Sequence, residues 1–253
     1  MQLSDRFGLP RNVTTPEDIQ VYQSTFELWM GNLPPIYDFT NPNKRDDDSQ
    51  PWIILHHHYL QTVSYSMVLG PFKGYLSRPM SRRSPSADLK IRCNGINYSL
   101  KLMEALRELF GYIYPNDANF YLLLFNIFDT AVVLCSSISN DQDGSIPRRP
   151  EILHAIDEAL AMLKRLRRVH SKARAAYELL AKIIQRTCQP MNLPGETWAC
   201  PLETALPIER GGPMSAQHPI DPSQHVDDAT FANHFDCCRR DRKPTPSFLT
   251  TVG

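Results

Sequence analysis

Three consecutive histidines, His56, His57 and His58, have side chains that commonly bind metal ions in proteins. They lie inside an apolar pattern with helical spacing, and successive residues on a helix point about 100° apart. Three such rings cannot converge on one ion, so we interpret them as exposed or core-edge histidines. His58 could meet a ligand from another helix, but the sequence offers no candidate.

A second set of metal-ligand types lies near the end of the chain, where Cys237 and Cys238 are adjacent and His234 is close by. A structural zinc ion needs four ligands, and the cysteine spacings match no zinc finger or ribbon. We therefore expect no metal site here. Cys93 and Cys135 fall in apolar helical patterns, where cysteine behaves as a small hydrophobe. The sequence has no disulfide framework, which favours a reducing compartment.

The segment Asp141-Gln-Asp-Gly begins like a calcium-binding loop. An EF-hand loop needs a glycine at its sixth position and a glutamate at its twelfth. Counted from Asp141, these positions hold Ile146 and Ile152, so we predict a plain turn.

The densest basic run extends from Lys164 to Arg174. It could be a nuclear import signal or a strip that contacts phosphates, but we favour the solvated face of two helices, with Leu166 and Val169 facing inward. The run Arg239–Lys243 is the better import candidate. Because the chain has 27 Lys and Arg and 27 Asp and Glu, any DNA contact must be local or lie outside it.

The chain contains none of the common catalytic motifs, such as a Gly-x-Ser-x-Gly elbow, a Walker loop or a Gly-x-Gly-x-x-Gly turn. We therefore predict no catalytic, cofactor-binding or metal site, and a protein that is not an enzyme. Arg78-Pro79 is interpreted as structural, because an arginine there can satisfy carbonyls at the end of a helix.

The hydrophobic periodicity predicts an all-α bundle of about six helices, with no strand-like alternation. The helices are expected to start near Pro16, Ser49, Ser86, Asn116, Pro150 and Ser171. Thr15 suits the N-cap of the first helix, and Ser171 that of the last.

The second helix is apolar on two faces, one with Trp52 and Tyr59 and the other with Met67, so we expect it to be central. Residues 120–138 are apolar nearly all round and should form the most buried helix. Asn126 and Asp129 interrupt this stretch, which argues against a membrane span. The helix that starts near Pro150 carries an apolar stripe of Ile152, Ile156, Leu160, Leu163 and Leu166. In the last helix the inner face is expected to be Ala175, Leu179 and Ile183.

After Gln189 the prolines recur and the helical period is lost. We predict a helical domain at 10–189 and a disordered, Pro-rich tail at 190–253, in which a short helix could form at 227–235.

Six segments in this order resemble the middle, regulatory region of fungal zinc-cluster transcription factors. Their starting residues and sequences are Phe26-Glu-Leu-Trp-Met-Gly-Asn-Leu-Pro-Pro, Trp52-Ile-Ile-Leu-His-His-His-Tyr, Leu76-Ser-Arg-Pro, Cys93-Asn-Gly-Ile-Asn-Tyr-Ser-Leu, Phe120-Tyr-Leu-Leu-Leu-Phe-Asn-Ile-Phe-Asp, and the pair at Glu158 and Ser171. The resemblance covers roughly residues 10 to 189. Each segment is unspecific alone, and their order carries the resemblance.

The resemblance implies a non-catalytic regulator of RNA polymerase II transcription of a metabolic pathway, located in the nucleus and not in a membrane. Its implied partners are the transcription machinery or a related regulator, a second copy of the chain, and a small-molecule inducer. The family's zinc cluster, a Cys-x2-Cys-x6-Cys run, has no counterpart in this sequence, and the resemblance begins in the second half of the middle region. DNA binding and zinc are therefore expected only in a missing upstream cluster. The alternatives are a modulator that pairs with a full-length regulator and a helical small-molecule-binding protein or enzyme.

Overall fold

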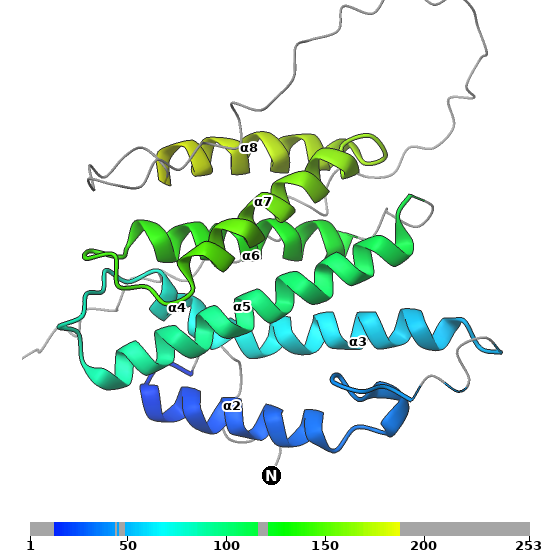
Figure 1. The fold of residues 1–253 in the computed structure, drawn as a ribbon, viewed down its shortest axis with the longest axis horizontal. Coiled ribbons are helices and arrows are strands. Elements are labelled where there is room, and N and C mark those ends of the chain that lie inside the picture. Colours follow the sequence, from blue (N-terminus) through cyan, green and yellow to red (C-terminus); the bar gives the residue numbers. More distant parts are fainter. Residues whose placement is uncertain (1–12, 44, 46–48, 116–120, 188–253) are drawn as a thin grey trace, which may run out of the picture. The chain divides into compact units, whose positions relative to one another are not determined.

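The computed structural model describes residues 13–43, 45, 49–115 and 121–187, and in these residues every regular element is helical (Figure 1). The all-α prediction is therefore confirmed. The six long helices are α2 (Pro16–Gly31), α3 (Trp52–Leu69), α5 (Ser86–Ile113), α6 (Tyr121–Ser139), α7 (Arg149–Leu166) and α8 (Ser171–Thr187). The short elements are η2 (Pro35–Tyr37), η3 (Gly70–Phe72) and α4 (Lys73–Leu76).

Every described residue belongs to one compact unit. The predicted tail, from residue 190 onward, and its short helix at 227–235 lie outside the described residues. The expected domain boundary at 189–190 stays a prediction.

Local sequence signals explain where several helices begin. Thr15 has extended backbone geometry and its hydroxyl accepts a hydrogen bond from the Asp18 amide at 3.1 Å, so it is the predicted N-cap of α2. At α8 the cap differs from the prediction, because Ser171 is already helical. The His170 ring nitrogen Nδ1 accepts from the Lys172 amide at 3.2 Å instead.

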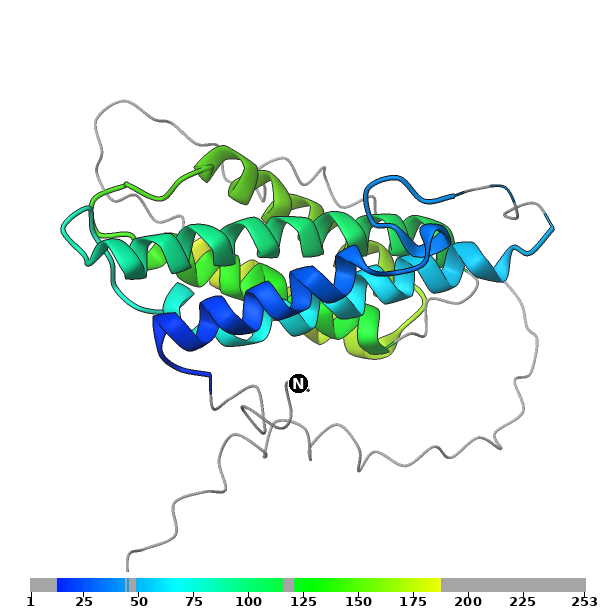
Figure 2. The same ribbon diagram turned by 90° about the horizontal axis from the view of Figure 1, so that it is seen from below.

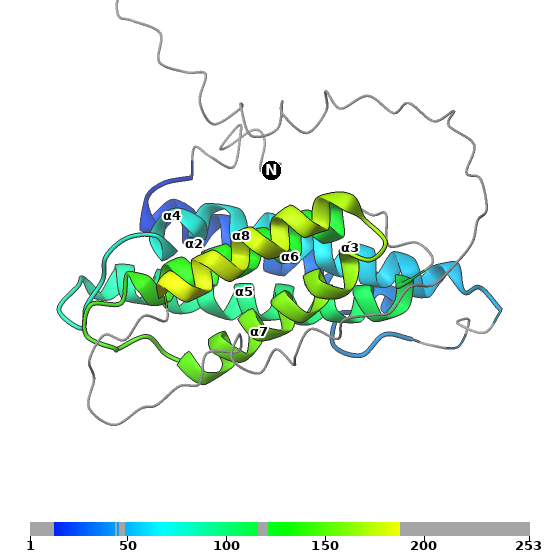
Figure 3. The ribbon, with the colours of Figure 1, turned by 90° about the horizontal axis from the view of Figure 1, so that it is seen from above.

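The long helices form two layers. In Figure 1, α5 and α7 pass in front of α3, α6 and α8, and α5 packs on both α3 and α6 while α7 packs on both α6 and α8. Figure 2 shows α2 beside α3 and α5, and Figure 3 shows α8 lying over α6. Each layer therefore buries one side and leaves the other side outward.

One glycine is needed for this packing. A Cβ atom built on Gly95 of α5 would lie only 3.0 Å from the Phe72 Cβ and 3.1 Å from a Leu76 methyl. Because real Cβ atoms essentially never come closer than this, a larger residue would push α5 away from η3 and α4.

The predicted core faces are right for α7 and partly wrong elsewhere. In α7 the expected stripe is buried throughout, at Ile152, Ile156, Leu160, Leu163 and Leu166. In α8 the expected inner residue Leu179 is 51% exposed, and Leu180 and Ile184 are buried in its place. The α8 helix has apolar residues on more than one side, so periodicity alone cannot say which of its sides packs inward.

After α3 the chain continues through η3 into the short helix α4, which covers Lys73–Leu76. Arg78 was expected to satisfy carbonyls, but its guanidinium lies over the Tyr75 ring, 4.1 Å from the centroid. The backbone itself occupies those carbonyls, since the Ser77 amide donates to Lys73 and the Arg78 amide to Tyr75. Met80 then forms an isolated β-bridge with Asp141.

Candidate functional site

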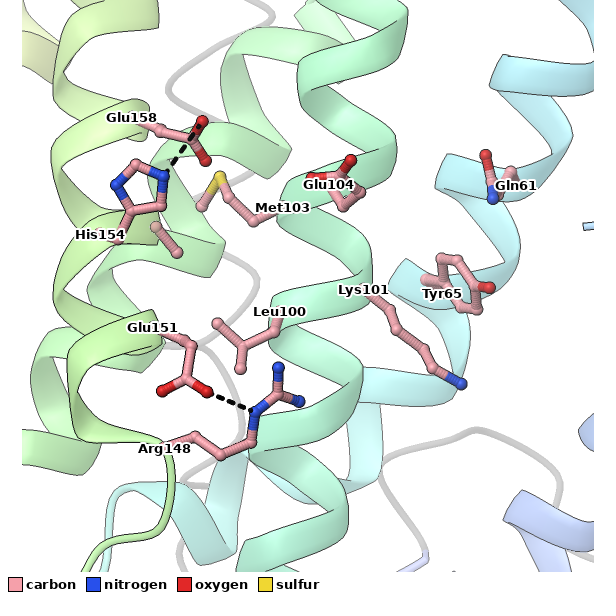
Figure 4. Close-up of a pocket in the computed structure, with 11 residues that line it drawn as sticks. Gln61, Tyr65, Leu100, Lys101, Met103, Glu104, Arg148, Glu151, His154 and Glu158 are labelled. Atoms are coloured by element: carbon pink, nitrogen blue, oxygen red, sulfur yellow. Dashed lines mark hydrogen bonds and ion pairs between the residues drawn. The ribbon is translucent and has the colours of Figure 1, made fainter. Parts of the chain in front are cut away.

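A groove crosses α5 between α3 and α7, with a volume of about 350 Å³ (Figure 4). This volume lies in the range of small-molecule sites in proteins, roughly 300–1,000 Å³. Its lining residues come from three helices and the residue before α7, and they are Gln61, Tyr65, Leu100, Lys101, Met103, Glu104, Arg148, Glu151, His154, Ala155 and Glu158. Leu100 and Met103 form an apolar floor between charged walls.

The α7 wall of the groove is held by ion pairs within the chain. Arg148 lies 3.4 Å from Glu151 and donates to the Asn97 amide oxygen of α5 at 3.1 Å. His154 lies 3.7 Å from Glu158, and both pairs are visible in Figure 4. The polar groups on this side are therefore already directed at one another.

Arg148 also has an unusual backbone. Its φ of 58° and ψ of 33° are left-handed, a conformation that a non-glycine residue adopts at a cost of about 1–2 kcal/mol. It occupies the residue before α7, so this conformation sets the direction in which α7 leaves the loop. The same residue therefore directs the helix and lines the groove.

The α3 wall differs, because Gln61 and Tyr65 carry no charge, and the cation beside them, Lys101, comes from α5. The Lys101 ammonium lies 6.0 Å from the centre of the Tyr65 ring and 5.5 Å from that of Tyr98. The Gln61 amide oxygen is buried and has no hydrogen-bond partner in the described part of the chain. Burial raises the pKa of Tyr65, so its hydroxyl stays protonated at neutral pH. The Gln61 side chain also hydrogen-bonds with Tyr65, so this side of the groove offers the Lys101 cation and the Tyr65 ring.

The lining residues are suited to binding a small molecule. A ligand acid could meet Lys101, and an apolar part could lie on Leu100 and Met103. The lining has no serine, threonine or cysteine that could serve as a nucleophile.

Beyond the groove, a buried ion cluster joins α5, α7 and the loop after α6. Arg92 is 2% exposed, lies 3.6 Å from Asp141, and donates to the Ser137 carbonyl at 2.7 Å. Asp141 also lies 3.6 Å from Arg149 and accepts from the Ile146 amide at 3.1 Å. Burial lowers the pKa of Arg92, and Asp141 opposes that shift. The charges of the cluster pair with one another, and the buried Arg92 Nε has no hydrogen-bond partner in the part of the chain that the structure describes.

This cluster corrects the interpretation of Asp141 as part of a plain turn. The loop does turn there, with Gly144 at a positive φ of 65°, but the aspartate is buried as the centre of the cluster. Arg92 and Asp141 are 49 positions apart, and no local pattern links them.

The three histidines contact three different parts of the protein. His56 packs its ring on Trp52, the His57 Nε2 lies 3.1 Å from the Asp38 carbonyl oxygen, and the His58 Nδ1 lies 3.6 Å from Glu108. The prediction that they diverge is therefore confirmed. In the described ranges no group of three His, Cys, Asp or Glu side chains is placed to hold a metal ion.

The basic run 164–174 covers the end of α7 and the start of α8. Arg165 lies over the rings of Phe110 and Tyr114, at 4.7 and 4.4 Å, and Arg167 lies over Tyr177 at 5.0 Å. These contacts place part of the run on aromatic rings of neighbouring helices. Leu166 is buried as expected, but Val169 is 41% exposed, so its predicted inward position is wrong.

Several sequence candidates lie outside the described residues. These are Cys237, Cys238, His234 and the basic run 239–243. The predictions made for them stay predictions.

Among the described residues, α6 is the helix long and apolar enough to cross a membrane. Some 61% of its apolar window is buried inside the protein, as in the core helix of a bundle. Asn126 within it donates to the Leu122 carbonyl and accepts from the Ser66 hydroxyl, which explains how this polar side chain is accommodated.

The groove was missed at the sequence level, because it combines residues from three segments. The helical face of α5 that carries Lys101 and Glu104 has the ordinary appearance of a solvated surface, and only the tertiary structure sets it between α3 and α7. No protein-family model matches the chain, and searches of curated proteins and of solved structures found no match.

Proposed function

We propose that this chain is a non-catalytic regulatory region of a fungal zinc-cluster transcription factor and that it acts in the nucleus. The observation that carries the proposal is the order of the resembling segments. Those beginning at Phe26, Trp52, Cys93 and Phe120 contribute to α2, α3, α5 and α6, and the closing pair falls on α7 and α8. A regulatory region of this kind needs a stable helical scaffold and a site that can sense a signal.

The groove supplies such a site. Its walls come from α3 and α7, which both pack on α5, so a ligand that contacts both walls favours the arrangement of helices that fits it best. The chain then changes the activity of the attached transcription machinery through a shift in population. DNA would be read by a separate zinc cluster, because the charge of this chain is balanced.

We expect the inducer to be a small molecule with an acidic group. Lys101 would bind the acid. The opposite wall would contribute less, because Arg148 and His154 are already paired with Glu151 and Glu158.

The proposal can be tested with the full chain fused to a heterologous DNA-binding domain in a fungal host. Reporter output is compared with that of the DNA-binding domain alone, on media that differ in carbon and nitrogen source. We expect the fusion to change the output in a medium-dependent way. The same output from both proteins on every medium would contradict a regulatory role.

Two lysines on one helix make the test specific for the groove. Lys101→Ala removes the groove cation, whereas Lys90→Ala removes an exposed charge of α5 that does not line the groove. We expect Lys101→Ala to reduce the medium-dependent response roughly tenfold, as for the loss of one charged hydrogen bond to a ligand, and Lys90→Ala to leave it intact. Equal effects of the two changes would remove the groove from the proposal.

A further inference from the structure

The loop between α4 and α5 contains a serine that follows two arginines and precedes a proline. The loop ends with Arg82-Arg83-Ser84-Pro85, and Ser86 begins α5. Arg82, Arg83 and Pro85 are exposed, and Ser84 is partly buried. Protein kinases select a serine by the charge pattern of the residues around it. These four residues therefore combine, on one exposed turn, features by which a kinase recognises its substrate.

The backbone around Ser84 also suits entry into the active site of a kinase. A proline disfavours helical backbone in the residue before it. Pro85 is itself extended, with φ −52° and ψ 139°, so Ser84 lies outside α5. The residues on either side, 82–83 and 85–87, are exposed. The segment can therefore extend once its turn opens.

Thr15 makes a useful comparison, because it is the other serine or threonine in the described ranges that precedes a proline. Its hydroxyl is the N-cap of α2 and accepts from the Asp18 amide at 3.1 Å. The residues after its proline are acidic, at Glu17 and Asp18. A phosphate on Thr15 would remove a cap and meet two negative charges, whereas a phosphate on Ser84 would meet two arginines.

The Ser84 hydroxyl and the Asp143 carboxylate stabilise the same turn. The Ser84 hydroxyl accepts from the Ser81 amide at 3.1 Å. The next amide, that of Arg82, donates to the Asp143 carboxylate at 2.7 Å. The two side chains thus accept from consecutive amides. Hydrogen bonds from the Ser145 hydroxyl and the Arg82 amide hold the pKa of Asp143 below its usual range, so this carboxylate is charged at neutral pH.

The contact with Asp143 connects this turn to the loop after α6. Two further hydrogen bonds join the same segments. The Met80 amide donates to the Asn140 carbonyl at 2.9 Å, and the Gln142 amide donates to the Met80 carbonyl at 3.0 Å. Both loops lie at the same end of the bundle, on the left in Figure 1. A change of charge at Ser84 therefore affects the segment that leads into α7.

We propose that Ser84 is phosphorylated by a kinase that recognises its arginine and proline neighbours, and that the phosphate separates the two loops. The Ser84 hydroxyl oxygen attacks the γ-phosphorus of ATP and forms a new O–P bond. The bond from that phosphorus to the bridging oxygen breaks, ADP leaves, and the hydroxyl proton passes to a base of the kinase. The phosphate carries a charge of about −1.5 to −2 at neutral pH. It pairs with Arg82 and Arg83 and repels Asp143. The inference does not depend on the proposed function.

The first test is incubation of the full chain with ATP and a purified proline-directed serine kinase, followed by mass spectrometry of its fragments. We expect phosphate on Ser84 ahead of Thr15, and none at position 84 in Ser84→Ala. Pro85→Ala should slow phosphorylation of Ser84 roughly tenfold, as for the loss of one specificity contact. Ser86→Ala is the matched control, because it removes an exposed hydroxyl two residues away and should leave that rate unchanged.

Hydrogen exchange of the phosphorylated chain tests the separation of the loops. We expect the Arg82 and Gln142 amides to exchange about fivefold faster than in the unmodified protein, because the phosphate repels the Asp143 carboxylate. Asp143→Asn keeps an acceptor and removes the charge, so phosphorylation should change its exchange much less. The amide of Leu180, in α8, serves as the internal reference and should exchange alike in all samples.

The proposal is overturned if Ser84 in the folded chain takes up no phosphate, or if Pro85→Ala is phosphorylated there at the parental rate. It is also overturned if phosphorylation leaves the exchange of Arg82 and Gln142 unchanged. An equal response of Asp143→Asn and the parent would contradict the role of the Asp143 charge. Circular dichroism verifies that Ser84→Ala keeps its helices, so that a loss of phosphate is not a loss of fold.

Discussion

The two layers of this protein differ in the residues on their outward sides. On the α5 and α7 side, charged residues cover the surface and pair across helices, as Arg107 does with Glu158 at 3.8 Å. On the other side, the outward residues of α3 and α6 are largely apolar, with Met67 and Tyr121 about half exposed, whereas α8 exposes Leu179 among charged residues such as Lys182 and Arg186. The chain therefore presents a polar surface that carries the groove on one side and apolar side chains on the outward sides of α3 and α6.

The largest effect on the free energy of unfolding is expected at the buried ion cluster of Arg92, Asp141 and Arg149. Asp141→Ala removes the acceptor between Arg92 and Arg149, and leaves Arg92 charged in the interior. We expect a loss of about 3–5 kcal/mol in the free energy of unfolding, measured by urea denaturation.

A double variant sharpens this prediction. Replacing Arg92 with Met together with Asp141→Leu removes both charges, and should restore much of the lost stability because no unpaired charge remains. If Asp141→Ala unfolds at the same urea concentration as the parent, the ion cluster does not stabilise this layer.

Two adjacent leucines in α8 give a smaller and more direct comparison. Leu180 is fully buried and Leu179 half exposed. At concentrations where the protein is monomeric, Leu180→Ala should cost about 2–5 kcal/mol, whereas Leu179→Ala should stay within about 0.5 kcal/mol. Thermal or urea denaturation of the two variants measures the difference. Equal losses would mean that α8 buries both sides.

The smallest effect on stability is the pH dependence that His170 causes where the two layers meet. Burial lowers its pKa, and the nearby Lys172 lowers it further, so the folded state favours the neutral ring that caps α8. The unfolded chain takes up the proton first as the pH falls. Stability is therefore full above about pH 6.5, the unperturbed pKa of histidine, and is lost as the pH falls through the lowered folded pKa.

His170→Asn keeps a side-chain acceptor for the Lys172 amide and removes this titration. Between pH 7 and pH 5 the variant should lose less stability than the parent, by at most about 1 kcal/mol, the usual energy of a helix cap. Melting temperatures at several pH values would show it, and parallel curves for the two proteins would exclude His170 as the cause.

The sequence alone predicted helices correctly where capping residues or a single apolar stripe are present. Thr15 and Pro16 marked the start of α2, and the regular stripe from Ile152 to Leu166 identified the buried side of α7. In α7 the opposite side is charged, so only one orientation hides the apolar residues.

The sequence was insufficient where apolar residues occupy more than one side of a helix. Leu179 and Leu180 are equally apolar, and only the position of α6 and α7 decides that Leu180 packs inward. The groove and the Arg92–Asp141 pair were missed for a related reason, since both depend on contacts between segments distant in the chain. Local periodicity contains no information on such contacts.

The bridge between Met80 and Asp141 has a consequence for the order of folding. It joins residues 61 positions apart, and the Arg92–Asp141 pair spans another 49, so neither can form until α5 and α6 lie side by side. Contacts that close such long loops are entropically costly early in folding. We therefore expect them to be absent from the transition state, so that their loss accelerates unfolding and leaves the refolding rate nearly unchanged. The ion cluster would then form after the transition state and set the unfolding rate, and so the lifetime of a folded molecule.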